Sequence, residues 1–413
     1  MIIIRKITII LLAIAILFIH TGSSNVWAAS KPDIKGQTAV LIDVKSGRVL
    51  YEKDAHIQWA PASTTKVLSV LLALEKANLN DIVTVSENAV DVDGTVIWLR
   101  EGEKQTLENL LYVMMLHSAN DAAVAVAQHI GGTVEGFAKL MNERVKTLGL
   151  KDTHFSTPNG LTADDHYSTA YDMAMIAREA MKNAKFREIS ATKSRPWRGT
   201  DWNGNLTNFN SLLSIYPGAT GIKNGYTSVS DWNLAASAER DGENYIAVVF
   251  GSPTKQALWE DAERLLDYGF DNFSNVSLVT EGEQIADLSV GSAEHSETVK
   301  ITTQADFSYL IGGEDAELPQ RKLVLEKTAA PIEKDENLGY VAFILGEEEI
   351  GRVAVTADKA VSEPTTWLDW WVRFTWVMAG LLVLRILIRF FQKRKKRRSF
   401  YNNYSRRGRS YGR

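Results

Sequence analysis

Ala60-Pro61-Ala62-Ser63-Thr64-Thr65-Lys66 precedes a mostly apolar run, Val67 to Leu74, and this stretch decides the fold. The pattern predicts a buried helix that begins at Ser63 and carries a hydroxyl at its N-terminus. Residues three apart lie on one face of a helix, so we expect the Lys66 amine beside the Ser63 oxygen. Burial can keep a lysine neutral, and a neutral lysine can act as the base that activates a serine.

The spacing Ser-x-x-Lys is weak evidence by itself. It also occurs where a serine caps a helix and the lysine reaches out to solvent. A second polar element, Ser118-Ala119-Asn120, falls between two predicted helices and can direct a hydroxyl and an amide into a cleft. Taken alone, this element also reads as an N-cap cluster for the helix that starts near Asp121.

A third element, Lys223-Asn224-Gly225-Tyr226-Thr227, lies on a predicted strand. Its lysine offers a cation to an anionic substrate group, and Gly225 allows a substrate backbone to approach closely. The alternative is an exposed strand lysine beside a bulge. The three elements together, in this order and on these predicted structures, are typical of penicillin-binding proteins and β-lactamases.

The composition excludes several other classes of protein. With 413 residues and 45% hydrophobic content the chain can bury full cores, and a net charge of −4 gives no general case for nucleic-acid binding. The absence of cysteine excludes disulfides and thiolate chemistry. Metal-ligand spacing is missing among the scattered histidines, which we interpret as ordinary surface or core residues: His117, His129, His154 and His166.

Targeting segments are predicted at both ends of the chain. Residues 1–28 form a signal peptide, with Arg5 and Lys6 before an apolar run and a small-residue cleavage site after it. Residues 367–391 form an apolar, aromatic membrane anchor, and a basic cytoplasmic tail, 392–413, follows it. A spanning helix is favoured because charges lie on opposite sides of it, although its uncharged centre is short and an interfacial anchor stays open.

Between these segments we expect two domains. Residues 33–272 form an α+β domain, a five-stranded antiparallel sheet with flanking helices and a helical insertion. Its strands are expected at 39–43, 48–52, 219–227, 232–238 and 245–251. Helices in this domain are expected to begin after Thr106, Asp121, Thr133, Thr169 and Thr254. Residues 276–361 form a small all-β domain with a structural or spacer role. Its strand-like segments are 277–280, 298–302, 323–326, 340–345 and 352–355.

The resemblance goes beyond the three motifs. Residues 36 to 270 resemble the catalytic domain of the D-alanyl-D-alanine carboxypeptidases, the low-molecular-weight penicillin-binding proteins of serine peptidase family S11. It rests on Ala60 to Lys66, His117 to Asp121, Gly149 to Phe155 and Gly221 to Thr227. The β-rich domain and the C-terminal anchor fit the usual layout of that family, which implies a bacterial enzyme on the outer side of the cell membrane.

The resemblance implies a role for each motif residue. Ser63 attacks the penultimate D-Ala of a peptidoglycan stem peptide that ends in D-Ala-D-Ala, and Lys66 is its base. Ser118 relays a proton to the leaving amine, and Asn120 binds the substrate amide and Lys66. The backbone N–H groups of Ser63 and Tyr226 form the oxyanion hole. No metal or cofactor enters this scheme, and β-lactam antibiotics are expected to inhibit by acylating Ser63.

The same resemblance implies that the strand motif binds the terminal carboxylate of the substrate through Lys223, Asn224 and Thr227. Gly225 allows the substrate backbone to approach the strand. One position departs from the family, whose pattern is Lys-Thr-Gly where this chain has Asn224. An amide can still donate a hydrogen bond to a carboxylate, but turnover can differ.

Two alternatives follow from the sequence. A class A β-lactamase deacylates through a Glu, and none lies between Ser156 and Ala170. A membrane-tethered, non-catalytic wall-binding protein could keep the fold, with Asn224 marking the loss of activity.

Overall fold

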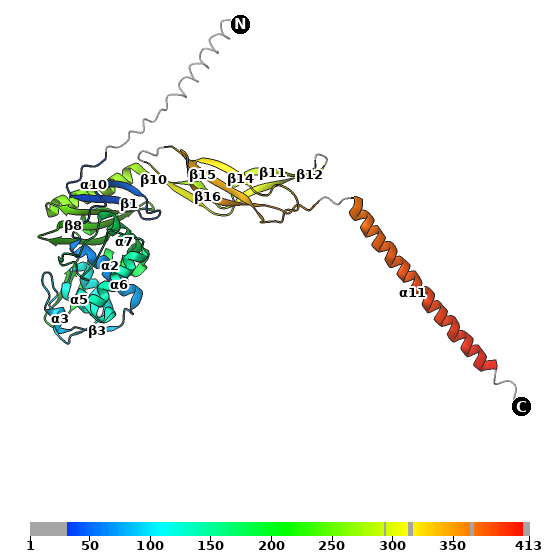
Figure 1. Cartoon of the computed structure of the whole chain (residues 1–413), viewed down its shortest axis with the longest axis horizontal. Helices are drawn as coiled ribbons and strands as arrows, with labels where there is room; N and C mark the ends of the chain where they lie inside the picture. Colours follow the sequence, from blue (N-terminus) through cyan, green and yellow to red (C-terminus); the bar gives the residue numbers. More distant parts are fainter. Residues whose placement is uncertain (1–30, 293–294, 313–316, 364–366, 408–413) are drawn as a thin grey trace, which may run out of the picture. The chain divides into compact units, whose positions relative to one another are not determined.

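A computed structural model describes residues 31–292, 295–312, 317–363 and 367–407 of the chain (Figure 1). The predicted signal peptide, 1–28, lies outside the described residues. The chain divides into two compact units after Val276, and Tyr309–Glu317 return to the first unit. The domain boundaries expected at 33, 272, 276 and 361 stay predictions.

The first unit is built on a five-stranded sheet with the strand order β2-β1-β9-β8-β7, in which every pairing is antiparallel. Its strands are β1 (Thr38–Asp43), β2 (Val49–Lys53), β7 (Ala219–Thr227), β8 (Asp231–Arg240) and β9 (Glu243–Ser252). This confirms the expected sheet.

The sheet is buried on both faces because its strands alternate side chains between two cores. Ala39 and Leu41 pack in the core that contains the apolar residues of α10 (Lys255–Asn272). Val40 and Ile42 face the helices of the insertion, among them α2 (Lys66–Lys76) and α7 (Ala170–Lys182). Figure 1 shows α10 on one side of the sheet and α2 and α7 on the other.

The helical insertion lies between β2 and β7. Its remaining helices are α3 (Glu87–Val90), α4 (Leu107–Leu116), α5 (Asn120–Gly131), α6 (Val134–Thr147), α8 (Ala184–Ala191) and α9 (Leu212–Ile215). Two small hairpins accompany them, β3 (Ile82–Thr84) with β4 (Lys104–Thr106) and β5 (Ser194–Arg198) with β6 (Asn203–Thr207).

Helix starts follow the capping residues in four of the five predicted places. Thr106, Thr133, Thr169 and Thr254 each accept a hydrogen bond from the backbone N–H three residues later. The prediction for Asp121 was wrong. α5 begins at Asn120, and the Asp121 carboxylate accepts hydrogen bonds from the backbone N–H groups of Ile97 and Leu99 in the loop before β4.

The expected helix start at Ser63 was also wrong in detail. Ser63 lies in a 3₁₀ turn, η1 (Ala62–Thr65), and α2 begins at Lys66. The Thr64 hydroxyl donates to the Pro61 carbonyl at 2.7 Å, which ties the tight turn to the residue before it.

The second unit is mainly β-structure, as expected. Its five-stranded sheet has the order β11-β12-β16-β15-β14, and β10 pairs separately with β13. The strands of this sheet are β11 (Gln284–Ser292), β12 (His295–Thr303), β14 (Gln320–Leu325), β15 (Asn337–Leu345) and β16 (Glu348–Ala357). The paired strands β10 (Phe273–Val279) and β13 (Phe307–Gly312) each belong partly to the first unit and partly to the second. Two of these strands, β11 and β13, were not predicted.

The last element is a long helix, α11 (Trp367–Arg407). The part from Asp369 to Lys393 is long and apolar enough to cross a membrane. The helix continues into the segment predicted as a separate basic tail, 392–413, of which residues 408–413 lie outside the described residues.

Candidate active site

The Ser63 hydroxyl and the Lys66 amine are in direct contact. Lys66 Nζ lies 2.9 Å from Ser63 Oγ, because one turn of helical backbone brings the two side chains to the same face. Ser63 is partly exposed, so a substrate can reach its hydroxyl, whereas Lys66 is completely buried.

The Lys66 amine has two further partners, and both are fixed acceptors. Its Nζ lies 2.8 Å from Asn120 Oδ1 and 2.7 Å from the backbone oxygen of Asn159. Burial lowers the pKa of Lys66 well below its usual value, and the nearby charge of Lys223 lowers it further against the opposing effect of Asp121. The site therefore favours the neutral amine, which has two hydrogens for these acceptors and a lone pair for Ser63.

Asn120, the first residue of α5, is held by a loop of the insertion. Its Nδ2 donates to the Asp93 carbonyl at 2.7 Å, and its backbone N–H donates to the Thr95 carbonyl at 2.7 Å. These bonds leave its side-chain oxygen directed at Lys66. Ser118 precedes it in a left-handed conformation with φ of 67°, and no described residue forms a hydrogen bond with the Ser118 hydroxyl.

Strand β7 passes beside Ser63. A Cβ added to Gly225 would lie 2.6 Å from the backbone nitrogen of Ser63, so only glycine allows this close approach. Lys223 is buried on the same strand, where its Nζ donates to the Asn224 carbonyl at 2.7 Å. Burial lowers the pKa of Lys223 to about 7. Asn224 is also buried, and its Oδ1 has no hydrogen-bond partner among the described residues.

Two residues of the strand motif have other contacts. The Tyr226 ring is exposed and lies 4.6 Å from the Trp232 ring between centroids. The Thr227 hydroxyl lies 2.9 Å from Ser230 Oγ in the turn that follows β7. Direct hydrogen bonds thus join Ser63, Lys66 and Asn120, and Lys223 contributes through its charge.

Sequence reasoning missed the residues that hold this arrangement. The Asn159 contact uses a backbone oxygen, which no sequence motif reveals. Asn233 of β8 donates from Nδ2 to the Ala60 carbonyl at 2.8 Å, and its Oδ1 accepts from the Gly251 N–H at 2.9 Å. The available signal in the sequence was an asparagine within a predicted apolar strand. Asn233 is completely buried, and a buried amide needs hydrogen-bond partners.

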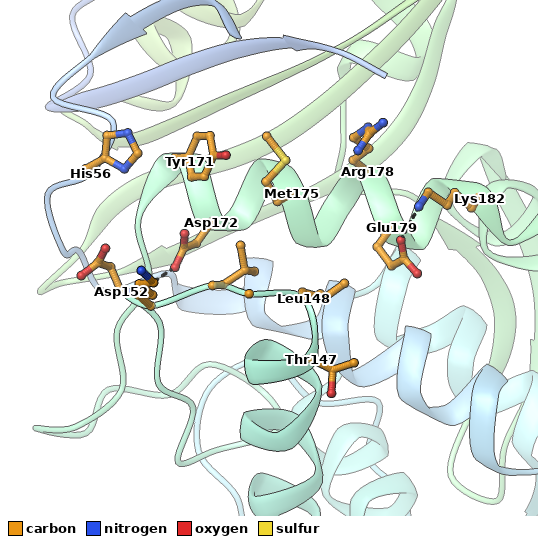
Figure 2. Close-up of a pocket in the computed structure, with 13 residues that line it drawn as sticks. His56, Thr147, Leu148, Asp152, Tyr171, Asp172, Met175, Arg178, Glu179 and Lys182 are labelled. Atoms are coloured by element: carbon orange, nitrogen blue, oxygen red, sulfur yellow. Dashed lines mark hydrogen bonds and ion pairs between the residues drawn. The ribbon is translucent and has the colours of Figure 1, made fainter. Parts of the chain in front are cut away.

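A separate hollow of about 480 Å³ lies between α7 and the segment that follows α6 (Figure 2). Several of its charged groups have partners within the chain. Glu179 contacts Arg144 and Lys182, and Asp172 accepts from the Thr153 hydroxyl at 2.8 Å. These pairings indicate a structural role for the side chains around the hollow. The residues that line it include no serine, so it lacks the serine–lysine pair of the site above.

No group of three or more His, Cys, Asp or Glu side chains among the described residues could hold a metal ion. The chemistry of this site belongs to a hydroxyl, two amines and an amide.

Comparisons with known proteins agree with the fold and the site. A family model described as D-alanyl-D-alanine carboxypeptidase, peptidase S11, matches residues 25–254, and one described as penicillin-binding protein 5, C-terminal domain, matches residues 273–363. The D-alanyl-D-alanine carboxypeptidase DacF of Bacillus subtilis is 35% identical over 333 residues, which cover 79% of this chain and 85% of that protein. DacA of Escherichia coli is 31% identical, over 77% of this chain and 82% of that protein.

Solved structures give the same result. Penicillin binding protein 5 from Haemophilus influenzae matches with a TM-score of 0.66 and 29% identity, over 81% of this chain and all of that chain. A mutant of the Streptomyces K15 DD-transpeptidase matches with a TM-score of 0.56 and 33% identity, over 58% of this chain and all of that chain.

The sheet, its helical insertion and the β-rich second unit define a penicillin-binding protein-like α+β fold. The chain belongs to the peptidase S11 family, the serine-type D-alanyl-D-alanine carboxypeptidases. The β-lactamase and the non-catalytic wall-binding alternatives are not favoured.

Proposed function

We propose that this protein removes the terminal D-Ala from peptidoglycan stem peptides ending in D-Ala-D-Ala, through an acyl-enzyme on Ser63. The observation that carries the proposal is the 2.9 Å contact between Ser63 Oγ and a buried Lys66 amine whose pKa is lowered. A buried lysine at that distance can accept the serine proton as the oxygen attacks.

In the first step, Ser63 Oγ attacks the carbonyl carbon of the penultimate D-Ala while its proton passes to neutral Lys66. The bonds from Lys66 to Asn120 and Asn159 occupy the two amine hydrogens, so the lone pair faces Ser63. The carbon–nitrogen bond then breaks, and Ser118 gives its proton to the leaving amine while it takes up the proton held by Lys66. Water later hydrolyses the ester and restores the Ser63 hydroxyl.

Backbone N–H groups of Ser63 and Tyr226 would bind the oxyanion that forms in this step. The proposal is supported by the close approach of β7 to the Ser63 nitrogen at Gly225. One such donor contributes typically about 3 kcal/mol in the transition state.

The substrate's terminal carboxylate would be bound by Lys223, Asn224 and Thr227. A pKa of about 7 leaves Lys223 partly protonated, and an adjacent carboxylate would raise this pKa and draw a proton onto the amine. The Asn224 amide could join it through its Nδ2, which can donate to a carboxylate, whereas the buried Oδ1 can only accept. To reach a ligand, Thr227 would exchange its contact with Ser230 for one with the carboxylate.

β-Lactams would acylate Ser63 and stay bound as a slowly hydrolysed ester. The segment between Ser156 and Ala170 contains no Glu that could activate a deacylating water. Rapid hydrolysis of a chromogenic cephalosporin by the purified protein would contradict this expectation.

One assay tests the proposed function. A pentapeptide ending in D-Ala-D-Ala is incubated with the wild type and with Ser63→Ala, and released D-Ala is measured. The expected result is release by the wild type that disappears in the variant. No release by a folded wild type would instead support a non-catalytic, wall-binding protein.

We also propose that α11 anchors the protein in the bacterial cell membrane with the catalytic unit on the extracytoplasmic side. Support comes from the apolar stretch Asp369–Lys393 and from the basic residues that follow it in the sequence.

A further inference from the structure

His166 is a buried histidine that joins two segments of the active site. Its Nε2 lies 2.9 Å from the hydroxyl of Thr65, the residue before Lys66. Its Nδ1 lies 3.1 Å from the Ser156 nitrogen and 3.3 Å from the Thr157 nitrogen, at the start of the loop 156–160. Only 3% of His166 is exposed, so the ring acts through these contacts.

The partners of His166 fix its tautomer. The backbone N–H of Ser156 can only donate, so Nδ1 must be the acceptor. The ring proton therefore lies on Nε2, which donates to the Thr65 hydroxyl. A second proton on Nδ1 would face the Ser156 N–H, so the charged ring does not fit this site.

The loop that His166 holds provides one of the Lys66 partners. The Asn159 carbonyl in this loop accepts from Lys66 Nζ at 2.7 Å. The following residue packs on the nucleophile turn, since a Cβ on Gly160 would lie 1.9 Å from the Ala62 oxygen. The position of the loop therefore decides whether the Asn159 oxygen meets the amine.

We infer that His166 is a positioning residue for the acylation step. By binding Thr65 on one side and the 156–160 loop on the other, it keeps the Asn159 carbonyl on Lys66, so that the amine lone pair faces Ser63. This inference rests on the proposed roles of Ser63 and Lys66. His166 touches neither the substrate nor the reacting atoms in this arrangement.

The charge state of His166 agrees with the role. Burial lowers the pKa of His166 to about 4. Asp165 opposes this shift, whereas the smaller effects of His154 and Lys66 add to it. The ring is therefore neutral, as its contacts require, across the neutral pH range.

The test measures acylation of the full-length protein by a fluorescent penicillin, with the first-order acylation rate and the dissociation constant determined separately. His166→Leu removes both hydrogen bonds. We expect its acylation rate to fall at least about tenfold while the dissociation constant stays within about twofold, because the defect lies in the orientation of Lys66. His166→Asn keeps an acceptor near the Nδ1 position, and His166→Gln keeps a donor near the Nε2 position. Each should recover part of the loss.

His154→Leu is the matched control. His154 lies in the same region, and its Nδ1 contacts the Asp165 carbonyl at 2.6 Å, away from Thr65 and the 156–160 loop. We expect acylation of this variant at the wild-type rate. Thermal unfolding of each variant shows whether it is folded, and if His166→Leu is not, the Asn and Gln variants decide by the same criterion.

Wild-type acylation rates in the folded His166 variants would overturn the inference. So would an equal loss in His154→Leu, or a loss of affinity that matches the loss of rate. Failure of the wild type to form an adduct on Ser63, seen by intact mass, would instead contradict the proposed function.

Discussion

At the scale of single residues, the central feature of the candidate site is a buried lysine. Lys66 is completely buried, and Lys223 is nearly so. Burial lowers the pKa of both amines, and the nearby charge of Lys223 lowers that of Lys66 further. The fold therefore provides a neutral amine beside Ser63 at a pH at which an exposed lysine would be protonated.

Lys66→Arg tests whether the neutral amine is the base. An arginine stays protonated, so we expect the acylation rate of the variant to fall by about 10³-fold. In the wild type, the neutral form of Lys66 increases as pH rises, and the acylation rate should rise with it along an acid limb well below pH 10.5. Rates measured from pH 5 to 10 check both statements. More than a tenth of the wild-type rate in the variant would exclude Lys66 as the base.

Replacement of Asn224 by an apolar residue should stabilise the fold but weaken substrate binding. Its buried Oδ1 lacks a partner among the described residues, and such a group costs about 1–3 kcal/mol of folding free energy. We expect Asn224→Leu to raise the free energy of unfolding by about 1 kcal/mol. The same change removes the proposed donor for the substrate carboxylate and should raise KM by about tenfold.

Asn224→Thr is the control for this prediction, since it keeps a donor and restores the family pattern. We expect its KM to stay within about threefold of the wild type, a difference of less than 1 kcal/mol. Denaturant unfolding and steady-state release of D-Ala measure the two effects. An unchanged KM in the Leu variant would remove Asn224 from the binding site.

At the scale of elements, the candidate site depends on the close approach of β7 to the turn η1, which carries Ser63. Gly225→Ala places a Cβ about 2.6 Å from the Ser63 backbone nitrogen, which no rotation of a side chain can relieve. The turn must shift, and we expect the acylation rate to fall by about 100-fold. Acylation by a fluorescent penicillin and thermal unfolding are the measurements.

Gly242→Ala provides the opposite pattern as a control. Gly242 lies in the turn between β8 and β9 with φ of 85°, and an added Cβ would meet no atom within 4 Å. Its substitution should cost about 1 kcal/mol of stability and leave acylation unchanged. Normal acylation by Gly225→Ala would show that η1 tolerates a shift of β7.

The same scale explains what the sequence could predict. Threonines such as Thr106 and Thr169 satisfy orphan N–H groups next to them, so helix starts follow from local chemistry. The strands of the first sheet follow from apolar runs and turns. The Asn159 and Asn233 contacts depend on backbone atoms far away in sequence. Asp121 was misassigned because its carboxylate accepts hydrogen bonds from Ile97 and Leu99, which lie in a loop more than twenty residues earlier.

At the scale of the whole molecule, the described residues form two units, each with its own five-stranded sheet, and the long helix α11. The first unit contains all the candidate site residues, whereas the second unit offers a β-sheet of its own. The alternating pattern predicted the β character of the second unit. It missed β11 and β13 because partly exposed strands with mixed polar residues carry a weak periodic signal.

The apolar side chains of α11 predict that the protein is bound to the membrane. Residues such as Leu381, Leu382 and Ile386 are each more than half exposed in the chain, and burial of such side chains in lipid is strongly favourable. We expect the full-length protein to stay with membranes after alkaline carbonate extraction, and a variant that lacks residues 367–413 to be soluble with unchanged kcat. Leu382→Arg puts a charge near the centre of the candidate span and should reduce insertion by about 3 kcal/mol, whereas Leu382→Ile should not. Release of the full-length protein by carbonate would contradict a spanning helix and support an interfacial one.

Protease digestion of sealed cells should remove the catalytic unit from outside and leave the basic tail protected, and the reverse pattern would place the active site in the cytoplasm.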